Sequence, residues 1–197
     1  MKRGFFACII ATVCLFLSTT CANAITIKSE TIPDSIHVGS PTTKLVLNGA
    51  GIRSKFFFSI YIGALYVPEK SHDPHVLEMM PGRKRVVMKF LYDEVSGSKL
   101  ASGWEEGFVN NQSEQQMSGL RSRLDKFKQL FPTVHKGDVI WLDYIPGSGT
   151  QVRVNTRLRG GNIQGADFYR ALLQVWLGEE PADSDLKRAM LGSEEED

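Results

Sequence analysis

Apolar positions along the chain follow two periods, one typical of strands and one typical of helices. In the N-terminal half they alternate or run together as β-branched and aromatic residues, which favours strands. The longest run, SKFFFSIYIGALYVPE at 54–69, predicts one long strand that ends at Pro68, and Gly49-Ala50-Gly51 just before it predicts a turn. Shorter strands are predicted for AITIKSETI, SIHVG and KLVLNGA before the turn and for RKRVVMKFLYDEV after the long run.

Helical spacing takes over in the middle of the chain. Leu100, Trp104 and Phe108 recur every four residues in GSKLASGWEEGFVNN, which places them on one face of a helix. Ser113 precedes Gln116 by three residues, a capping box that predicts the start of a second helix in SEQQMSGLRSRLDKFKQLF. Further helices are predicted for GADFYRALLQVWLG and SDLKRAMLG, a short one for DPHVLEMM, and a β-hairpin for GDVIWLDYIPGSGTQVRVNTRL. The order of elements predicts an α+β domain in which an antiparallel sheet carries its helices on one face.

Residues 1–24 are predicted to be a secretory signal peptide rather than part of the fold. A basic pair precedes an apolar stretch that is too short for a permanent membrane span, and Ala22-Asn23-Ala24 is a cleavage signal of the small-x-small type. A lipid anchor at Cys21 is the alternative. We therefore expect a periplasmic or secreted protein that has no integral membrane span after cleavage.

The mature chain is expected to be one domain over residues 25–192, followed by a disordered acidic tail at 193–197. Cleavage after Ala24 would remove all three cysteines, so the mature protein would have no disulfide and no thiolate metal ligand. It would carry 21 basic against 22 acidic residues. This near balance gives no electrostatic reason to expect a nucleic acid partner.

Catalytic and metal-binding patterns are sparse. His72 and His75 lie three apart near a predicted helix start, but no third ligand follows at a recognisable spacing, and solvated loop histidines are the favoured interpretation. The chain has no Gly-x-Ser-x-Gly turn, GSGT at 147–150 lacks a phosphate-binding lysine, and GGNIQG is misplaced for a dinucleotide site. We therefore predict no catalytic residue, no metal and no cofactor.

One charge interrupts the apolar pattern, because Arg53 stands at the head of the predicted long strand. One interpretation is a strand-end arginine whose stem covers apolar surface while its guanidinium reaches solvent. The other is an arginine at the mouth of an apolar cavity that binds a carboxylate in bidentate fashion, with the Tyr61 phenol as a further donor. In a straight strand these two residues would be about 26 Å apart. They can meet only if the chain turns between them, for example near Ser54–Phe57.

The stretch LNGAGIRSKFFFSIYIGALYV resembles a signature of the chalcone isomerase-like superfamily, in particular its bacterial secreted branch. GWEEGFVNN, GDVIWLDYIPGSGTQVRVN, IQGADFYRALLQVWLG and LKRAMLG extend the likeness in family order over roughly residues 40–192. The resemblance implies an open-faced β-sandwich, in which a large antiparallel sheet packs against a layer of helices with a ligand cleft between them. The superfamily contains plant enzymes that close a chalcone to a flavanone and non-catalytic relatives that bind fatty acids.

The resemblance also implies roles for individual residues. Arg53 matches the arginine that the enzymes and the fatty-acid binders share, and Tyr61 matches the tyrosine of the binders, where the plant enzymes have threonine. The enzymes also use a tyrosine and an asparagine on the following helix. Here an apolar residue near Leu100 takes the place of that tyrosine, and Asn110 or Asn111 comes too late. The catalytic pattern is thus incomplete.

We therefore predict a non-catalytic binding protein for a fatty acid or a similar apolar carboxylate, held at its carboxylate by Arg53 and Tyr61. The cleft is expected to be lined by Phe57, Ile60, Trp104, Phe108 and Leu172. For most of these apolar residues, ordinary core packing is the competing interpretation. Two other functions stay open: an isomerase or lyase acting on an enone substrate, and an envelope protein-interaction module without a small ligand.

Overall fold

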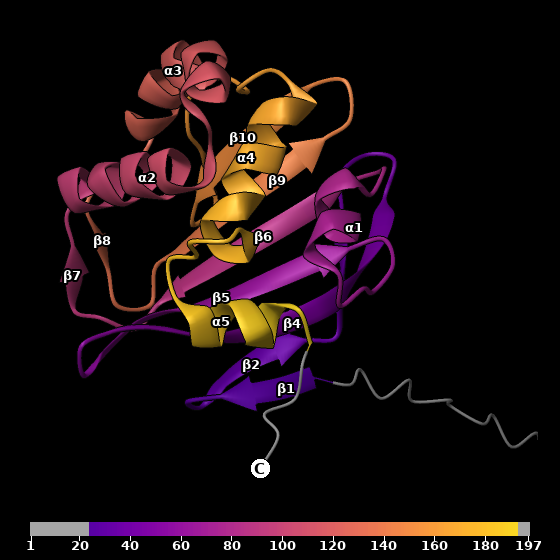
Figure 1. Cartoon of the computed structure of the whole chain (residues 1–197). Helices are drawn as coiled ribbons and strands as arrows, with labels where there is room; N and C mark the ends of the chain where they lie inside the picture. The colour runs from indigo at the N-terminus through magenta and orange to yellow at the C-terminus, as the bar shows by residue number, and fades with distance from the viewer. Residues whose placement is uncertain (1–23, 193–197) are drawn as a thin grey trace, which may run out of the picture.

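The computed structural model describes residues 24–192 of the chain. Seven of its strands form one antiparallel sheet in the order β11-β10-β9-β6-β5-β4-β3 (Figure 1). These strands are β3 (Ser35–Val38), β4 (Thr43–Lys55), β5 (Phe58–Val67), β6 (Lys84–Phe90), β9 (Val139–Ile145), β10 (Gly149–Val154) and β11 (Arg157–Leu158). Two further antiparallel pairs lie beside it, formed by β1 (Ala24–Ile27) with β2 (Glu30–Pro33) and by β7 (Glu94–Val95) with β8 (Val134–His135).

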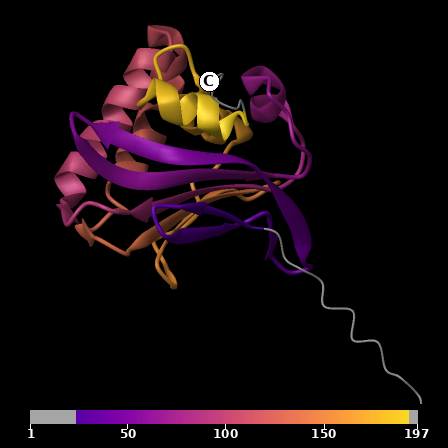
Figure 2. The same cartoon turned by 90° about the horizontal axis from the view of Figure 1, so that it is seen from below.

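The helices cover one face of this sheet. They are α1 (Pro74–Met79), α2 (Gly97–Asn111), α3 (Glu114–Lys128), α4 (Ala166–Leu177) and α5 (Ser184–Met190). Figure 2 shows the helices together above the sheet and the β1–β2 hairpin beneath its opposite face. The predicted α+β fold with an antiparallel sheet packed against a layer of helices is confirmed. No helix between residues 24 and 192 combines the length and the apolar character that crossing a bilayer requires.

Local signals in the sequence mark the starts of three helices. Ser113 and Gln116 form the predicted capping box at the start of α3, and Asp73 caps α1 ahead of a proline in its first turn. Asp183 caps α5, and its side chain accepts a hydrogen bond from the Leu186 backbone N–H. Helix ends depend on contacts between near neighbours in the chain, so the sequence displays them directly.

The predicted long strand at 54–69 is wrong in one respect, because the chain turns within it. Phe56 has a positive φ of 56°, and the segments on either side of Phe56 and Phe57 form the antiparallel hairpin of β4 and β5. Aromatic residues favour strands, and that local preference hid the reversal. The run SKFFFSIYIGALYVPE is therefore the end of one strand, a tight turn and a second strand.

The predicted turn at Gly49-Ala50-Gly51 is also wrong, since these residues lie inside β4. A Cβ atom on Gly49 would lie 2.0 Å from the carbonyl oxygen of Ala189 in α5, and one on Gly51 would lie 2.5 Å from the Ala189 Cβ. The glycines therefore allow a helix to lie directly on the strand, and they do not mark a reversal. Asn48 beside them joins the two elements further, because its side chain donates to the carbonyl oxygens of Ser71 and Met190.

The hydrophobic core lies on both faces of the sheet and is larger on the helical side. Phe168, Leu172 and Trp176 of α4 are fully buried there. A smaller cluster on the opposite face includes Tyr66, whose hydroxyl donates to the carbonyl oxygen of Pro33 at 2.9 Å. The two tyrosines of β5 thus face opposite sides of the sheet, as the strand period of two requires for an odd and an even position.

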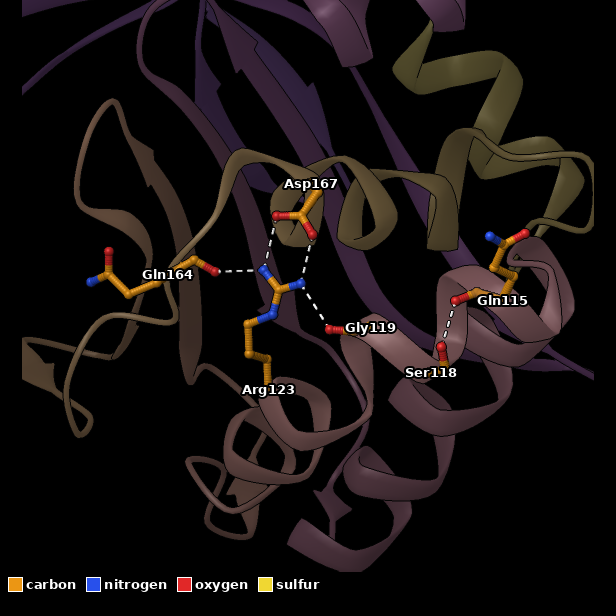
Figure 3. A network of polar contacts seen from close by, with 6 residues as sticks. All are labelled: Gln115, Ser118, Gly119, Arg123, Gln164 and Asp167. Atoms are coloured by element: carbon orange, nitrogen blue, oxygen red, sulfur yellow. Dashed lines mark hydrogen bonds and ion pairs between the residues drawn. The ribbon is translucent and has the colours of Figure 1, made fainter.

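A largely exposed ion pair links α3 to the start of α4 (Figure 3). Arg123 binds both carboxylate oxygens of Asp167, at 2.8 and 2.6 Å, and also donates to the carbonyl oxygens of Gln164 and Gly119. Two of these hydrogen bonds hold the first turn of α4, one holds the loop before it, and the fourth anchors the guanidinium to its own helix. This loop carries the chain from the β9–β10 hairpin back over the sheet.

Asp167→Asn is expected to lower the free energy of unfolding by about 1 kcal/mol at neutral pH. Arg123 holds the pKa of the Asp167 carboxyl below its ordinary value, so the native state binds fewer protons than the unfolded state in the acidic range. The stabilisation is fully present above the unfolded-state pKa of about 4 and is lost as the pH falls through the folded pKa. Urea unfolding of both proteins across this range measures it. A difference that keeps its size at acidic pH would contradict the ion pair as its source.

The predicted signal peptide, the three cysteines and the acidic tail lie outside the described residues, apart from Ala24, which begins β1.

Candidate functional site

The β4–β5 hairpin places Arg53 directly opposite Tyr61. The two residues are partners in the antiparallel register, and the guanidinium carbon of Arg53 lies 5.7 Å from the centroid of the Tyr61 ring. The turn at Phe56 and Phe57 supplies the reversal that a meeting of these residues requires. Arg53 and Tyr61 are eight positions apart in the sequence, and a straight strand would hold them far from each other. The hairpin makes them a cross-strand pair on the helical side of the sheet.

A cleft of about 530 Å³ opens between the sheet and α2 at this pair, near the start of α2. The start of α2 is on the left in Figure 1. The buried residues of its inner wall are Tyr61, Met88, Phe90, Leu100, Trp104 and Val175. The exposed residues of its rim are Lys55, Phe56, Phe58, Glu94, Ser98, Lys99, Ser102 and Glu106. An apolar interior with a few polar groups and a charged rim is typical of small-molecule sites of this volume.

Arg53 contributes an uncompensated positive charge to the cleft. Its Nε atom is buried without a hydrogen-bond partner, and no ion pair within residues 24–192 includes Arg53. The nearby carboxylate of Asp183 is bound instead by the backbone N–H groups of Ser54 and Leu186, at 2.8 and 2.9 Å. A half-buried guanidinium without an ion pair favours an anionic or strongly accepting ligand.

Tyr61 presents a neutral phenol beside that charge. Its side chain is 3% exposed, and its hydroxyl oxygen accepts a hydrogen bond of 2.9 Å from Trp176 Nε1. Burial raises the pKa of Tyr61, although the charge of Arg53 acts in the opposite direction. The phenol therefore keeps its proton at neutral pH, and because Trp176 occupies the acceptor side of the oxygen, this O–H remains able to donate.

Trp104 adds a second donor that sequence reasoning missed. The indole lines the cleft and packs edge-on against Trp176, with ring centroids 5.7 Å apart. Its Nε1 atom is buried without a hydrogen-bond partner. Helical periodicity shows only that Trp104 faces inward, so the sequence indicated an apolar wall. The structure shows that this wall residue also carries an N–H donor without a partner.

The other residues predicted to line the cleft lie in three different places. Ile60 lines the cleft as expected. Phe108 and Leu172 do not, because they are fully buried in the core, where the Phe108 ring packs on Phe168 at 5.2 Å between centroids. Phe57 does not either, since it is fully exposed at the tip of the hairpin. We therefore correct the predicted site by removing these three residues.

Strand β6 supplies part of the cleft that the sequence analysis did not assign. Phe90 is the register partner of Tyr61, and Met88 lies two positions away on the same face. The alternation along RKRVVMKF shows that both face the core, but the neighbouring strand must be known before they can be assigned to the site.

Leu100 lies near the helix position that the resemblance matched to a catalytic tyrosine. Leu100 lines the cleft. Asn111 lies at the far end of α2, where its side chain binds the backbone of Gly107 and Glu180, and Asn110 lies at that same end. Neither asparagine reaches the cleft.

Metal ligation finds no support in the described part of the chain. No group of three His, Cys, Asp or Glu residues gathers within residues 24–192. His72 and His75 are both exposed, as predicted, and the His72 Nδ1 atom lies 2.7 Å from the carbonyl oxygen of Leu191.

Comparison with known proteins relates this chain to a protein family and to a solved structure of similar fold. The profile of the chalcone isomerase-like family matches residues 24–192. The chain belongs to this family. A crystal structure of a fatty-acid binding protein of Arabidopsis thaliana is similar in fold, with a TM-score of 0.65 over 86% of this chain and 96% of that one, at 16% sequence identity. No curated protein matches the chain.

The family membership confirms the resemblance on which Arg53 and Tyr61 were assigned. In this member of the chalcone isomerase-like family the two residues are cross-strand neighbours at a cleft between sheet and helices. Their role in holding a ligand is a separate question, which depends on the chemistry of the cleft.

Proposed function

We propose that this chalcone isomerase-like protein binds a fatty acid or a similar apolar carboxylate in the cleft between the sheet and α2. The observation that carries the proposal is Arg53, a partly buried guanidinium that has no ion pair within residues 24–192 and lies over the Tyr61 ring. A carboxylate would pair with it, accept a hydrogen bond from the Tyr61 phenol and leave an acyl chain against the apolar wall. The fold likeness to a plant fatty-acid binding protein supports the same assignment.

The cleft provides the two kinds of interaction that such a ligand needs. Met88 and Phe90 of β6 and Leu100 of α2 offer apolar surface to the ligand chain. Each methylene that leaves water there contributes about 0.8 kcal/mol. The guanidinium fixes the headgroup, because two parallel N–H···O bonds orient a carboxylate as well as attract it. The proposed function is therefore that of a carrier or store for amphipathic acids.

The proposed setting is the periplasm or the exterior of the cell. It rests on the signal-peptide pattern of residues 1–24, and the described part of the structure does not bear on it. N-terminal sequencing of the protein purified from its native host would test it, because cleavage is expected after Ala24. A mature chain that begins at Met1 would overturn it.

Affinity is expected to rise with chain length in a series of saturated fatty acids. Two additional methylenes should strengthen binding about tenfold, until the acyl chain fills the cleft and the increase ends. Isothermal titration calorimetry with delipidated protein, at acid concentrations below micelle formation, measures the series. Mass spectrometry of the protein under native conditions identifies any acid that is retained during purification.

The methyl ester of the best acid is the matched control, since it keeps the chain and loses the charge. We expect the ester to bind at least tenfold more weakly. An ester that binds as well as the acid would show that the cleft takes apolar chains without recognising a carboxylate. Absence of binding along the whole acid series would contradict the proposed function.

A further inference from the structure

The turn between β4 and β5 exposes three consecutive phenylalanines. Phe56 is 86% exposed, Phe57 is fully exposed and Phe58 is 57% exposed. The hairpin carries them past the end of the adjacent strand, because β6 ends at Phe90, opposite Tyr61, and the turn lies further on. In Figure 1 it is the purple loop at the lower left. Single exposed apolar residues are common on proteins, whereas a cluster of three at a projecting tip marks a site of interaction.

The requirements of the turn do not explain these aromatic side chains. Phe56 adopts a φ of +56°, which favours glycine or asparagine and strains a residue with a bulky side chain. Its side chain gains little packing in return, since most of it is in solvent. The only ring contact that the tip makes is that of Phe58, which lies edge-on to Tyr92 at 5.6 Å between centroids within the described residues.

Basic groups stand at the base of the tip, and the cleft opens beside it. Lys55 is exposed and immediately precedes the phenylalanines, and Lys28 of the β1–β2 turn donates from Nζ to the Ser59 hydroxyl at 2.9 Å. Lys55, Phe56 and Phe58 are also rim residues of the cleft. The acidic rim residues Glu94 and Glu106 belong to β7 and α2, on the other side of the opening.

We propose that this hairpin tip, residues 55–58, docks the protein on the surface of a lipid bilayer. Phe56 and Phe57 would enter the boundary between headgroups and acyl chains, while Lys55 and Lys28 would contact anionic headgroups. When the protein docks in this way, the mouth of its cleft faces the lipid. The docking is independent of the proposed ligand, and only the further step, in which an amphipathic acid passes between bilayer and cleft, rests on the proposed function.

A bilayer fits this tip better than a protein partner does. A stable protein interface takes about 20 to 30 residues from each side, and a tip of four residues cannot supply them. Insertion into lipid requires no matching surface, only exposed aromatic side chains with cationic groups behind them. The convex shape of a hairpin end and the order of Lys55 before the phenylalanines satisfy this condition.

The test is co-sedimentation of the delipidated protein with vesicles of phosphatidylcholine, with and without phosphatidylglycerol. We expect the parent protein to sediment with both and more strongly with the anionic vesicles. Phe57→Asp is expected to lower the partition coefficient at least about tenfold. Because Phe57 is fully exposed, this substitution should leave the unfolding transition unchanged. The matched control is Val76→Asp, which places the same charge on an exposed apolar position in α1, beyond the opposite end of β5.

Three results would overturn the proposal. They are a parent protein that stays in the supernatant, a Phe57→Asp variant that sediments like the parent, and a Val76→Asp variant that loses binding to the same degree. Concentration-dependent self-association that Phe57→Asp abolishes, without vesicle binding, would assign the tip to a second copy of the chain and would also overturn it. Titration of each variant with a fatty acid in vesicle-free buffer keeps a failure of docking distinct from a failure of the proposed ligand.

Discussion

Replacing Arg53 with alanine is expected to weaken fatty-acid binding about 100-fold, or by about 3 kcal/mol. The guanidinium is the only cation that lies against the Tyr61 ring within the described residues, and its Nε atom is buried and unpartnered. The variant would leave the carboxylate of the ligand without its counter-charge in a mostly apolar cleft, where an unpaired charge costs more than it does in water. Calorimetric titration with the fatty acid that binds best measures the loss.

The stability of the Arg53→Ala variant should stay close to that of the parent, because Arg53 has no ion pair to lose within residues 24–192. This separates a headgroup role from a structural one. Arg53→Lys should bind with intermediate affinity, since an ammonium keeps the charge but not the planar pair of donors. Arg157→Ala removes an exposed arginine from the edge strand β11 and is the matched control. A variant of Arg53 that keeps the parent affinity would refute the headgroup role.

Gly49→Ala is expected to destabilise the protein by about 3 kcal/mol, a large effect for one added methyl group. The new Cβ would lie 2.0 Å from the Ala189 carbonyl oxygen and 2.9 Å from the Gly192 nitrogen, both of them backbone atoms that cannot move aside by a change of rotamer. The strand and α5 must separate to admit it. Separation would also disturb the Asn48 side chain, whose donor bonds to the Met190 carbonyl at 2.8 Å. Urea unfolding followed by circular dichroism measures the loss.

Gly119→Ala is the matched control for this substitution. Gly119 is exposed in α3, and no atom lies within 4 Å of the place where its Cβ would be. The same change should therefore stabilise the protein by up to about 1 kcal/mol, because alanine is the better helix former. If Gly49→Ala were as stable as the parent, α5 would not pack on β4 as closely as the structure shows.

Much of the secondary structure follows from local signals. The four-residue spacing of Leu100, Trp104 and Phe108 predicts α2, and the Ser113–Gln116 capping box places the start of α3. Each signal depends on residues within one or two turns of one another, so a reading of the sequence alone can find it. Local signals did not predict the reversal at Phe56, since three aromatic residues in a row favour a strand more strongly than a turn.

Helical spacing alone does not separate the cleft residues of α2 from its core residues. Trp104 and Phe108 carry the same periodic signal and face the same side of α2. Trp104 lines the cleft, whereas Phe108 packs on Phe168 in the core. The difference comes from elements far away in the sequence. Both rings contact α4, Phe108 at Phe168 and Trp104 at Trp176, but only Trp104 also borders the cleft. No pattern within α2 encodes this distinction.

The sequence by itself determined the α+β class, the helix caps and the position of an unusual cation in an apolar run, because periodicity, capping and charge are properties of near neighbours. Only the tertiary structure decided that Arg53 faces Tyr61, that Gly49 admits a helix and that Phe57 points into solvent. These outcomes depend on the register between strands and on the distance at which a helix crosses a sheet. Both are set by packing among segments separated by up to 140 residues, such as Gly49 and Ala189.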